Sequence, residues 1–316
     1  MSVLASPGLT NFVAGKQAVL AELIDTAAAA RTSMDVDVFR AGGAFANELA
    51  SSIADGVRTR AFVTNSRAAL AEVRPIVDAG NGSGRVVPYG GKVKGHETFN
   101  HVKLVQADGE RLTVSTAAMT MDDVDRIDWG MTVTGAPAAA AHRVARALES
   151  GGTKALRRAL AEADAAGLHY NEPKAGTYHA TAAWLRAIAG ARPGTDIWIA
   201  TKKITSVDAA HALIDASDAG VGVHLVVARP SDKVRGILAG SGVDARVTPW
   251  PGPSLHGNLT ATADRVLLGT MYYSKRALGT STAGSSRELL LAATDPTAVA
   301  QARSAIEAIH ATATPL

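Results

Sequence analysis

A histidine and a lysine near residue 100 have the types and the spacing for chemistry on an anionic substrate. His101 and Lys103 alternate with Val102 and Leu104, and this period of two predicts a strand on which both polar side chains point to one side. A neutral imidazole there can attack an electrophile or transfer a proton, and an ammonium beside it can hold an anionic oxygen. On its own, the pair also fits a polar strand edge that faces solvent.

Small and hydroxylic residues follow this pair, and an acid comes after them. A second strand-like run over 111–114 leads into Ser115, Thr116 and two alanines, whose backbone and hydroxyl donors could approach a ligand. Asp128 stands further along the chain. This order favours a site over a plain surface edge.

Helical and strand patterns alternate through the first 90 residues. The sequence predicts helices over 15–31, 44–54 and 68–79 and strands over 34–39, 59–64 and 85–89. Gly56 stands where a left-handed residue ends the second helix. The β-α-β-α-β order predicts right-handed crossovers and a largely parallel sheet covered by helices on both faces, which is an α/β fold.

The second half of the chain repeats this order at an offset of about 155 to 165 residues, the size of one domain. The corresponding residues are Asp35 and Asp196, Gly56 and Gly220, His101 and His256, Thr116 and Thr270, and Asp128 and Glu288. A duplicated unit explains them, with halves at 1–150 and 177–316 and a linker with one helix at 151–176. Chance similarity of two ordinary α/β stretches is the alternative.

These residues resemble the pattern of the phospholipase D superfamily, which reads His-x-Lys, four residues, Asp, and later Gly-Ser-x-Asn and an acid. His101, Lys103 and Asp108 match its first letters in type and spacing, and the resemblance extends over nearly the whole chain. It implies two tandem α-β-α sandwich halves related by a pseudo-twofold axis. His101 and His256 would then face one phosphate across the interface between the halves.

The resemblance also implies a role for each matching residue. His101 would be the nucleophile that forms a phosphohistidine, and His256 would protonate the leaving alcohol and later act as a base. Asp128 and Glu288 would accept hydrogen bonds from the far ring nitrogens of the histidines and fix their tautomers.

Other matching residues would bind the substrate. Lys103 and Thr116 would hold the non-bridging phosphate oxygens as charge builds. Thr270 is the counterpart of Thr116, and Asp108 completes the first motif.

The second half departs from the pattern. Asn258 takes the place of the lysine near His256, and Tyr272 stands where an asparagine is expected. Ala263 replaces the aspartate, unless Asp264 serves after a shift of one residue. Lys202 and Lys203 lie just past the carboxyl end of a predicted strand, where α/β sheets place ligands, and could replace the missing donors. Solvated surface lysines are the alternative.

Composition limits the class of substrate. The chain of 316 residues has 32 Lys and Arg against 29 Asp and Glu, a net charge of +3, and only 4% aromatic residues. Nucleic acid is not an expected partner, because a nuclease would need a longer basic track and aromatic stacking residues. The absence of cysteine excludes disulfides and thiolate catalysis.

Neither a cofactor nor a metal is expected, because histidine and lysine supply the nucleophile and the charge. The remaining histidines show no partner spacing; they are His96, His142, His169, His179, His211, His224 and His310. No targeting segment and no apolar run of about 18 residues is evident, which predicts a soluble protein, either cytoplasmic or secreted after removal of a signal peptide. We expect a monomer.

Several functions fit these observations. The first is a metal-independent phosphodiester hydrolase or transferase whose substrate is a phospholipid, including lipid at a membrane surface, or a related phosphodiester. The others are a nuclease or small-molecule phosphoesterase of the same superfamily, a phosphate-binding protein that has lost catalysis, and an unrelated α/β protein with structural histidines.

Overall fold

The computed structural model describes residues 8–38, 40–78, 82–93, 96–120, 125–249, 254–279 and 285–316. Its first half is built on one sheet. In spatial order the strands are β1 (Gly8–Ala14), β8 (Trp129–Thr134), β7 (Arg111–Ser115), β6 (Leu104–Ala107), β2 (Ser33–Val38), β3 (Arg58–Thr64) and β4 (Gly84–Val93). Here β2, β3 and β4 are parallel neighbours, and the other pairs are antiparallel.

The second half repeats this sheet strand for strand. Its spatial order is β9 (Leu168–Glu172), β16 (Ser285–Ala293), β15 (Val266–Gly269), β14 (Asn258–Ala261), β11 (Asp196–Ile204), β12 (Gly222–Pro230) and β13 (Asp244–Val247). Again three neighbours, β11, β12 and β13, are parallel and the others antiparallel. The short strands β10 (Thr177–Tyr178) and β17 (Thr314–Pro315) extend the two edges. The predicted α/β fold with two related halves is confirmed. The sheets are mixed and not largely parallel as predicted, because short turns join β6 to β7 and β14 to β15 as antiparallel pairs.

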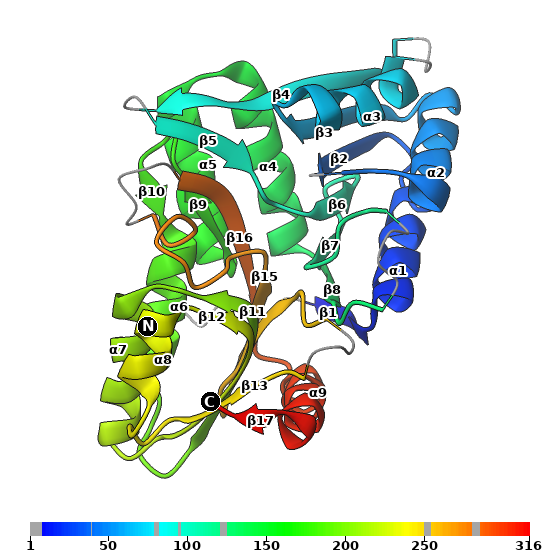
Figure 1. The fold of residues 1–316 in the computed structure, drawn as a ribbon. Helices are drawn as coiled ribbons and strands as arrows, with labels where there is room; N and C mark the ends of the chain where they lie inside the picture. Colours follow the sequence, from blue (N-terminus) through cyan, green and yellow to red (C-terminus); the bar gives the residue numbers. More distant parts are fainter. Residues whose placement is uncertain are drawn as a thin grey trace.

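One strand joins the two sheets. β5 (His96–Asn100) pairs with β4 in an antiparallel manner and with the start of β16 in a parallel manner. Figure 1 shows β16, in brown, running from its start beside β5 down into the second sheet. Because β5 leads directly into His101, this junction lies beside the predicted site.

Helices cover both sheets (Figure 1). They are α1 (Lys16–Ala28), α2 (Gly43–Ala54), α3 (Arg67–Asp78), α4 (Ala136–Ser150), α5 (Thr153–Ala165), α6 (His179–Ala189), α7 (Val207–Asp218), α8 (Asp232–Leu238) and α9 (Pro296–Thr312). Local signals fix several ends. The Ser206 hydroxyl accepts from the third residue of α7, and α4 ends at Gly151 with φ 71°, a left-handed cap. Within the described residues, none of the helices combines the length and apolar character that crossing a membrane requires.

The segment 151–176, expected to be a linker with one helix, contains α5 and also β9. β9 takes the place in the second sheet that β1 has in the first. Its sequence, Leu-His-Tyr-Asn-Glu, alternates apolar and polar residues over its first four positions, and all five residues are buried. Helix α5 packs on α4 and β9, and Leu156, Leu160 and Leu168 join a core cluster that also contains Trp129 and Leu255.

Candidate active site

His101 follows β5 directly, and the pairing of β5 with β16 brings it to an acid of the other half. Its backbone N–H donates to the Arg287 carbonyl at 3.0 Å, and its Nδ1 lies 2.9 Å from Glu288 Oε2. Lys103 Nζ lies 3.2 Å from His101 Nε2. The side chains of His101 and Lys103 therefore lie together as predicted. Residues 101–103 form the connection between β5 and β6, however, and not a strand.

His256 has the mirrored arrangement. A parallel bridge joins Leu255 to Ile127, the His256 backbone N–H donates to the Ile127 carbonyl at 3.1 Å, and His256 Nδ1 lies 2.9 Å from Asp128 Oδ1. Each histidine thus contacts one of the two predicted acids, and that acid comes from the opposite half of the chain. The cause is strand pairing across the interface, which the order of residues does not reveal.

Gly257 allows this close approach. A Cβ atom there would lie 2.4 Å from the Trp129 ring and 2.8 Å from Thr116 Oγ1. Both of those residues support Asp128, so any larger side chain would push His256 away from its acid.

Thr116 and Thr270 hold the acids and not the substrate, which corrects their predicted role. Thr116 Oγ1 donates to Asp128 Oδ1 at 2.7 Å and accepts from Trp129 N. Thr270 Oγ1 donates in the same way to Glu288 Oε2 at 2.7 Å and accepts from a backbone N–H of β16. A hydroxyl has one proton, so neither side chain has a donor left for a phosphate oxygen.

Asp108 also differs from its predicted place in substrate binding. It occupies the turn between β6 and β7 with φ 55°, and its carboxylate accepts from the backbone N–H groups of Arg31, Thr32 and Ser33, each at 2.8 Å. Asp-Gly at a tight turn tolerates this left-handed backbone. The residue holds the start of β2 in place, and it does not line the pocket described below.

Asn258 does not replace the lysine of the second motif. It is buried, its Oδ1 accepts from Thr201 Oγ1 at 2.5 Å, and its Nδ2 donates to the Thr270 carbonyl at 3.4 Å. The amide is therefore used to join strands. Lys202 comes closer to that role, because it lines the same pocket as His101. Burial is the main cause of the lowered pKa values of His101 and His256, and the charge of Lys202 adds a smaller share.

Tyr272, expected at the position of a missing asparagine, lies between the two histidines. Its ring centroid is 5.1 Å from that of His101 and 6.5 Å from that of His256. Its hydroxyl is 3.3 Å from His256 Nε2, and Lys202 Nζ lies 5.8 Å from its ring centroid. One side chain thus contacts both imidazoles, and its phenol is a hydrogen-bond donor at the centre of the site.

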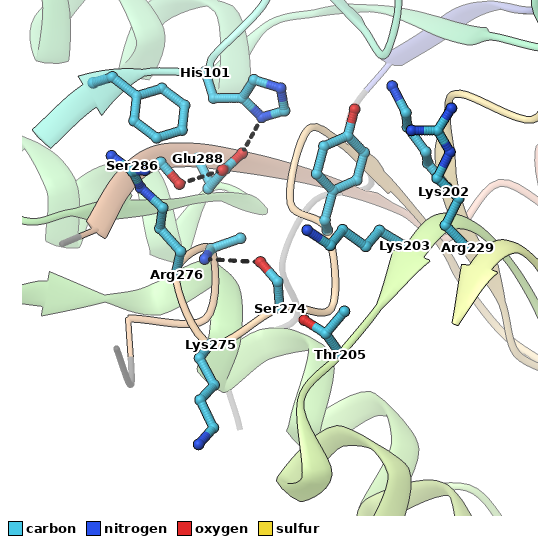
Figure 2. A pocket seen from close by; sticks show the side chains of 13 residues that line it. His101, Lys202, Lys203, Thr205, Arg229, Ser274, Lys275, Arg276, Ser286 and Glu288 are labelled. Carbon is cyan, nitrogen blue, oxygen red and sulfur yellow. Dashed lines mark hydrogen bonds and ion pairs between the residues drawn. The ribbon is translucent and has the colours of Figure 1, made fainter. Parts of the chain in front are cut away.

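A pocket of about 550 Å³ opens on His101, Tyr272 and Glu288. Figure 2 shows Lys203 pointing toward the middle of the pocket and Lys275 pointing away. Its basic lining residues are Lys202, Lys203, Arg229, Lys275 and Arg276, and the carboxylate in its lining is that of Glu288. The predicted pair Lys202 and Lys203 therefore does lie at the site.

Sequence reasoning missed Arg229, Arg276 and Ser286. Arg229 is the register partner of Lys203 in the parallel strand β12, so the carboxyl-end rule used for Lys203 could have found it. Ser286 Oγ donates to Glu288 Oε1 at 2.5 Å. Arg276 lies in a connection, with its guanidinium 4.3 Å from the Phe99 ring centroid, and carries no comparable signal.

Burial sets the protonation of the reactive groups. It lowers the pKa of His101, against the opposing effect of Glu288, and it lowers the pKa of His256 to about 4, against the opposing effect of Asp128. Burial also lowers the pKa of Lys103 to about 8. At pH 7 both imidazoles are neutral and Lys103 is largely an ammonium ion.

Arg287 ties the two halves together beside Glu288. It is fully buried, pairs with Asp37 of the first sheet, and its Nε lies 3.1 Å from Glu172 Oε2 of the second. Burial raises the pKa values of Asp37 and Glu172, and the guanidinium opposes that shift in both. A charged pair network inside the interface therefore fixes the strand that carries Glu288.

Solved structures share this architecture. Polyphosphate kinase from Porphyromonas gingivalis matches with a TM-score of 0.66 and 16% identity over 94% of this chain, which spans 46% of the kinase chain. Phosphatidylserine synthase from Haemophilus influenzae matches with a TM-score of 0.63 and 11% identity, over 97% of this chain and 87% of the synthase. Yeast tyrosyl-DNA phosphodiesterase matches with a TM-score of 0.56 and 11% identity, over 90% of this chain and 87% of the yeast chain.

The sequence alone matches neither a protein-family model nor a curated protein. The likeness to these solved structures is therefore one of fold. The chain shares its overall fold with the polyphosphate kinase and the phosphatidylserine synthase.

Proposed function

We propose that this protein is a phosphodiester hydrolase or transferase that works through a phosphohistidine on His101. The observation that carries the proposal is the pair of histidine–acid contacts around Tyr272, with Lys103 3.2 Å from His101 Nε2. Because Glu288 binds Nδ1, the Nε2 lone pair is the one that can react. Lys103 then stands where the phosphoryl oxygens gain charge.

In the first step, His101 Nε2 attacks phosphorus. The N–P bond forms while the P–O bond to the leaving alcohol breaks, and His256 gives that oxygen its proton. His256 is neutral in the free site, so it must gain this proton as substrate binds. A phosphate anion beside it favours the protonated form, since an opposite charge raises a histidine pKa.

In the second step, neutral His256 takes a proton from water or from an alcohol. That oxygen attacks phosphorus, the P–N bond breaks, and His101 returns to its starting state. Water yields hydrolysis and an alcohol yields transfer. Tyr272 and Lys202 supply the donors that the second motif lacks, because Asn258 is occupied elsewhere.

The basic pocket favours a substrate with more than one anionic group. Lys202, Lys203, Arg229 and Arg276 exceed what one phosphodiester charge requires, and they extend beyond His101. Phospholipids with an acidic head group and compounds with several linked phosphates meet this condition. Tripolyphosphate should therefore compete with a simple phosphodiester more strongly than orthophosphate does, and Arg229→Ala should reduce that difference.

Hydrolysis of bis(4-nitrophenyl) phosphate tests the proposed function. We expect turnover by the wild type in the presence of EDTA, loss of turnover in His101→Ala, and retention in His211→Ala, which changes an exposed histidine of α7. Turnover that persists in His101→Ala would contradict the assignment. Binding of phosphate without turnover of any phosphodiester would favour a non-catalytic phosphate-binding protein.

A further inference from the structure

Two histidines and an aspartate that the sequence left unconnected come together at the far end of the second sheet. His224 lies at the start of β12, Asp244 at the start of β13 and His310 near the end of α9. His224 and the pocket residue Arg229 are five positions apart on β12, which is about 16 Å along a strand. The cluster is therefore separate from the candidate active site.

The three donor atoms have the spacing of metal ligands. His310 Nε2 lies 3.3 Å and His224 Nδ1 lies 3.6 Å from Asp244 Oδ2, and the ligand atoms of the group all lie within 4.8 Å of one another. Donors about 2.0–2.1 Å from a tetrahedral zinc ion are roughly 3.3 Å apart. Two of the three pairs already match, and a small rotation of the imidazoles would close the third.

Surrounding side chains hold these ligands in place. The His224 ring stacks on Trp198 with centroids 3.9 Å apart and 12° between the planes, and His310 meets the same indole edge-on at 5.4 Å. Arg246 Nε donates to Asp244 Oδ1 at 3.1 Å, which orients the carboxylate. Such outer contacts are typical of metal sites, because they fix the direction of each ligand.

One buried nitrogen of the cluster lacks a hydrogen bond within the described part of the chain. His224 Nδ1 is buried and has no hydrogen-bond partner among the described residues. It faces Asp244 Oδ2 at a distance too long for a hydrogen bond. A cation between these atoms would satisfy both the nitrogen lone pair and the carboxylate charge.

We propose that His224, Asp244 and His310 bind a divalent transition-metal ion, zinc in the first place. Two imidazoles and one carboxylate form a three-ligand zinc set with one position open to water. The ion would join β12, β13 and α9 and would stabilise their packing. The alternative is a metal-free cluster, in which His310 Nε2 donates to the Asp244 main-chain carbonyl at 3.3 Å.

Metal titration of the intact protein tests this proposal. Equilibrium dialysis against zinc should show one tight equivalent that is missing in His224→Gln and in His310→Gln and retained in His211→Gln, a matched change on an exposed face of α7. Zinc should also raise the Tm of the wild type and of His211→Gln but not that of the two ligand variants. Equal zinc binding by the wild type and both ligand variants would overturn the proposal.

Trp198 gives a second readout that needs no ligand variant. Cobalt(II) bound next to the stacked indole should quench its fluorescence, and the quenched amplitude should fall in Trp198→Phe, which keeps all three ligands. Cobalt that leaves the wild-type fluorescence unchanged would contradict the site even if the histidine variants did not fold.

Discussion

Glu288→Gln should slow the attack by His101, although the two residues belong to different halves of the chain. The Glu288 side chain is 1% exposed and accepts from His101 Nδ1 at 2.9 Å, Thr270 Oγ1 at 2.7 Å and Ser286 Oγ at 2.5 Å. Glutamine keeps the shape but turns one acceptor into a donor. A hydrogen bond to a charged group contributes about 1.5–3 kcal/mol, and about 1.4 kcal/mol is tenfold in rate, so we expect a loss of roughly 10- to 150-fold.

Rapid-quench kinetics with bis(4-nitrophenyl) phosphate would measure this effect as the rate of the nitrophenolate burst. This leaving group needs no proton, so Asp128→Asn, which alters His256, should leave the burst rate close to that of the wild type and slow the steady state. Circular dichroism melts of both variants would show that they fold. A normal burst in Glu288→Gln with a slow burst in Asp128→Asn would refute the assignment of His101 as the nucleophile with Glu288 as its acid.

Four further changes have definite expected results. The kcat/KM should fall as pH rises through about 8, because Lys103, whose pKa is lowered to about 8, loses its positive charge there. Lys103→Arg should abolish this fall at high pH. A fall that persists in Lys103→Arg would belong to another group. His256 has a pKa of about 4 in the folded protein against about 6.5 when unfolded. Its contribution to the free energy of unfolding is therefore complete above pH 6.5, and about 3 kcal/mol is lost on acidification to pH 4. Urea unfolding of His256→Phe should lack this loss. Thr270→Val should cost about 1–3 kcal/mol in the free energy of unfolding, because Glu288 Oε2 loses one of its two donors and the Leu289 backbone N–H loses its acceptor. Thr270→Ser should restore most of it; equal losses would point to packing. Arg287→Leu should cost about 3–5 kcal/mol, because two buried carboxylates lose their counter-ion; a small change in the denaturant midpoint would show that the pair network is dispensable.

Much of the fold followed from local sequence patterns. The predicted helices and strands of the first half agree with α1, β2, α2, β3, α3 and β4 within a few residues, because their sequences carry the periods and end signals of helices and strands. β9 was missed because it is only five residues long and stands between Gly167 and Pro173, in a stretch that reads as a linker. Its pairing with β16, far along the chain, decides its structure.

The site was predictable only where a residue acts through its own chemistry. His101, Lys103 and His256 could be found from type and spacing, and the acids from the repeat. The exchange of the acids could not, because it depends on strand pairing across the interface. The predicted role of Thr116 and Thr270 was wrong for a related reason. A buried hydroxyl binds the nearest carboxylate, and only three-dimensional contacts show which acceptor that is.

Mapping the covalent intermediate tests the central claim most directly. The protein would be mixed with bis(4-nitrophenyl) phosphate, quenched within the burst phase and digested, and the phosphorylated peptide would be identified by mass spectrometry under conditions that preserve phosphohistidine. One nitrophenolate leaves in the first step, so we expect a 4-nitrophenylphosphoryl group on His101 in the wild type. The same adduct should have a higher occupancy in His256→Ala, since removal of water's general base slows its breakdown. An adduct on His256 would reverse the roles of the two histidines, and no adduct with any phosphodiester would contradict catalysis through a phosphohistidine.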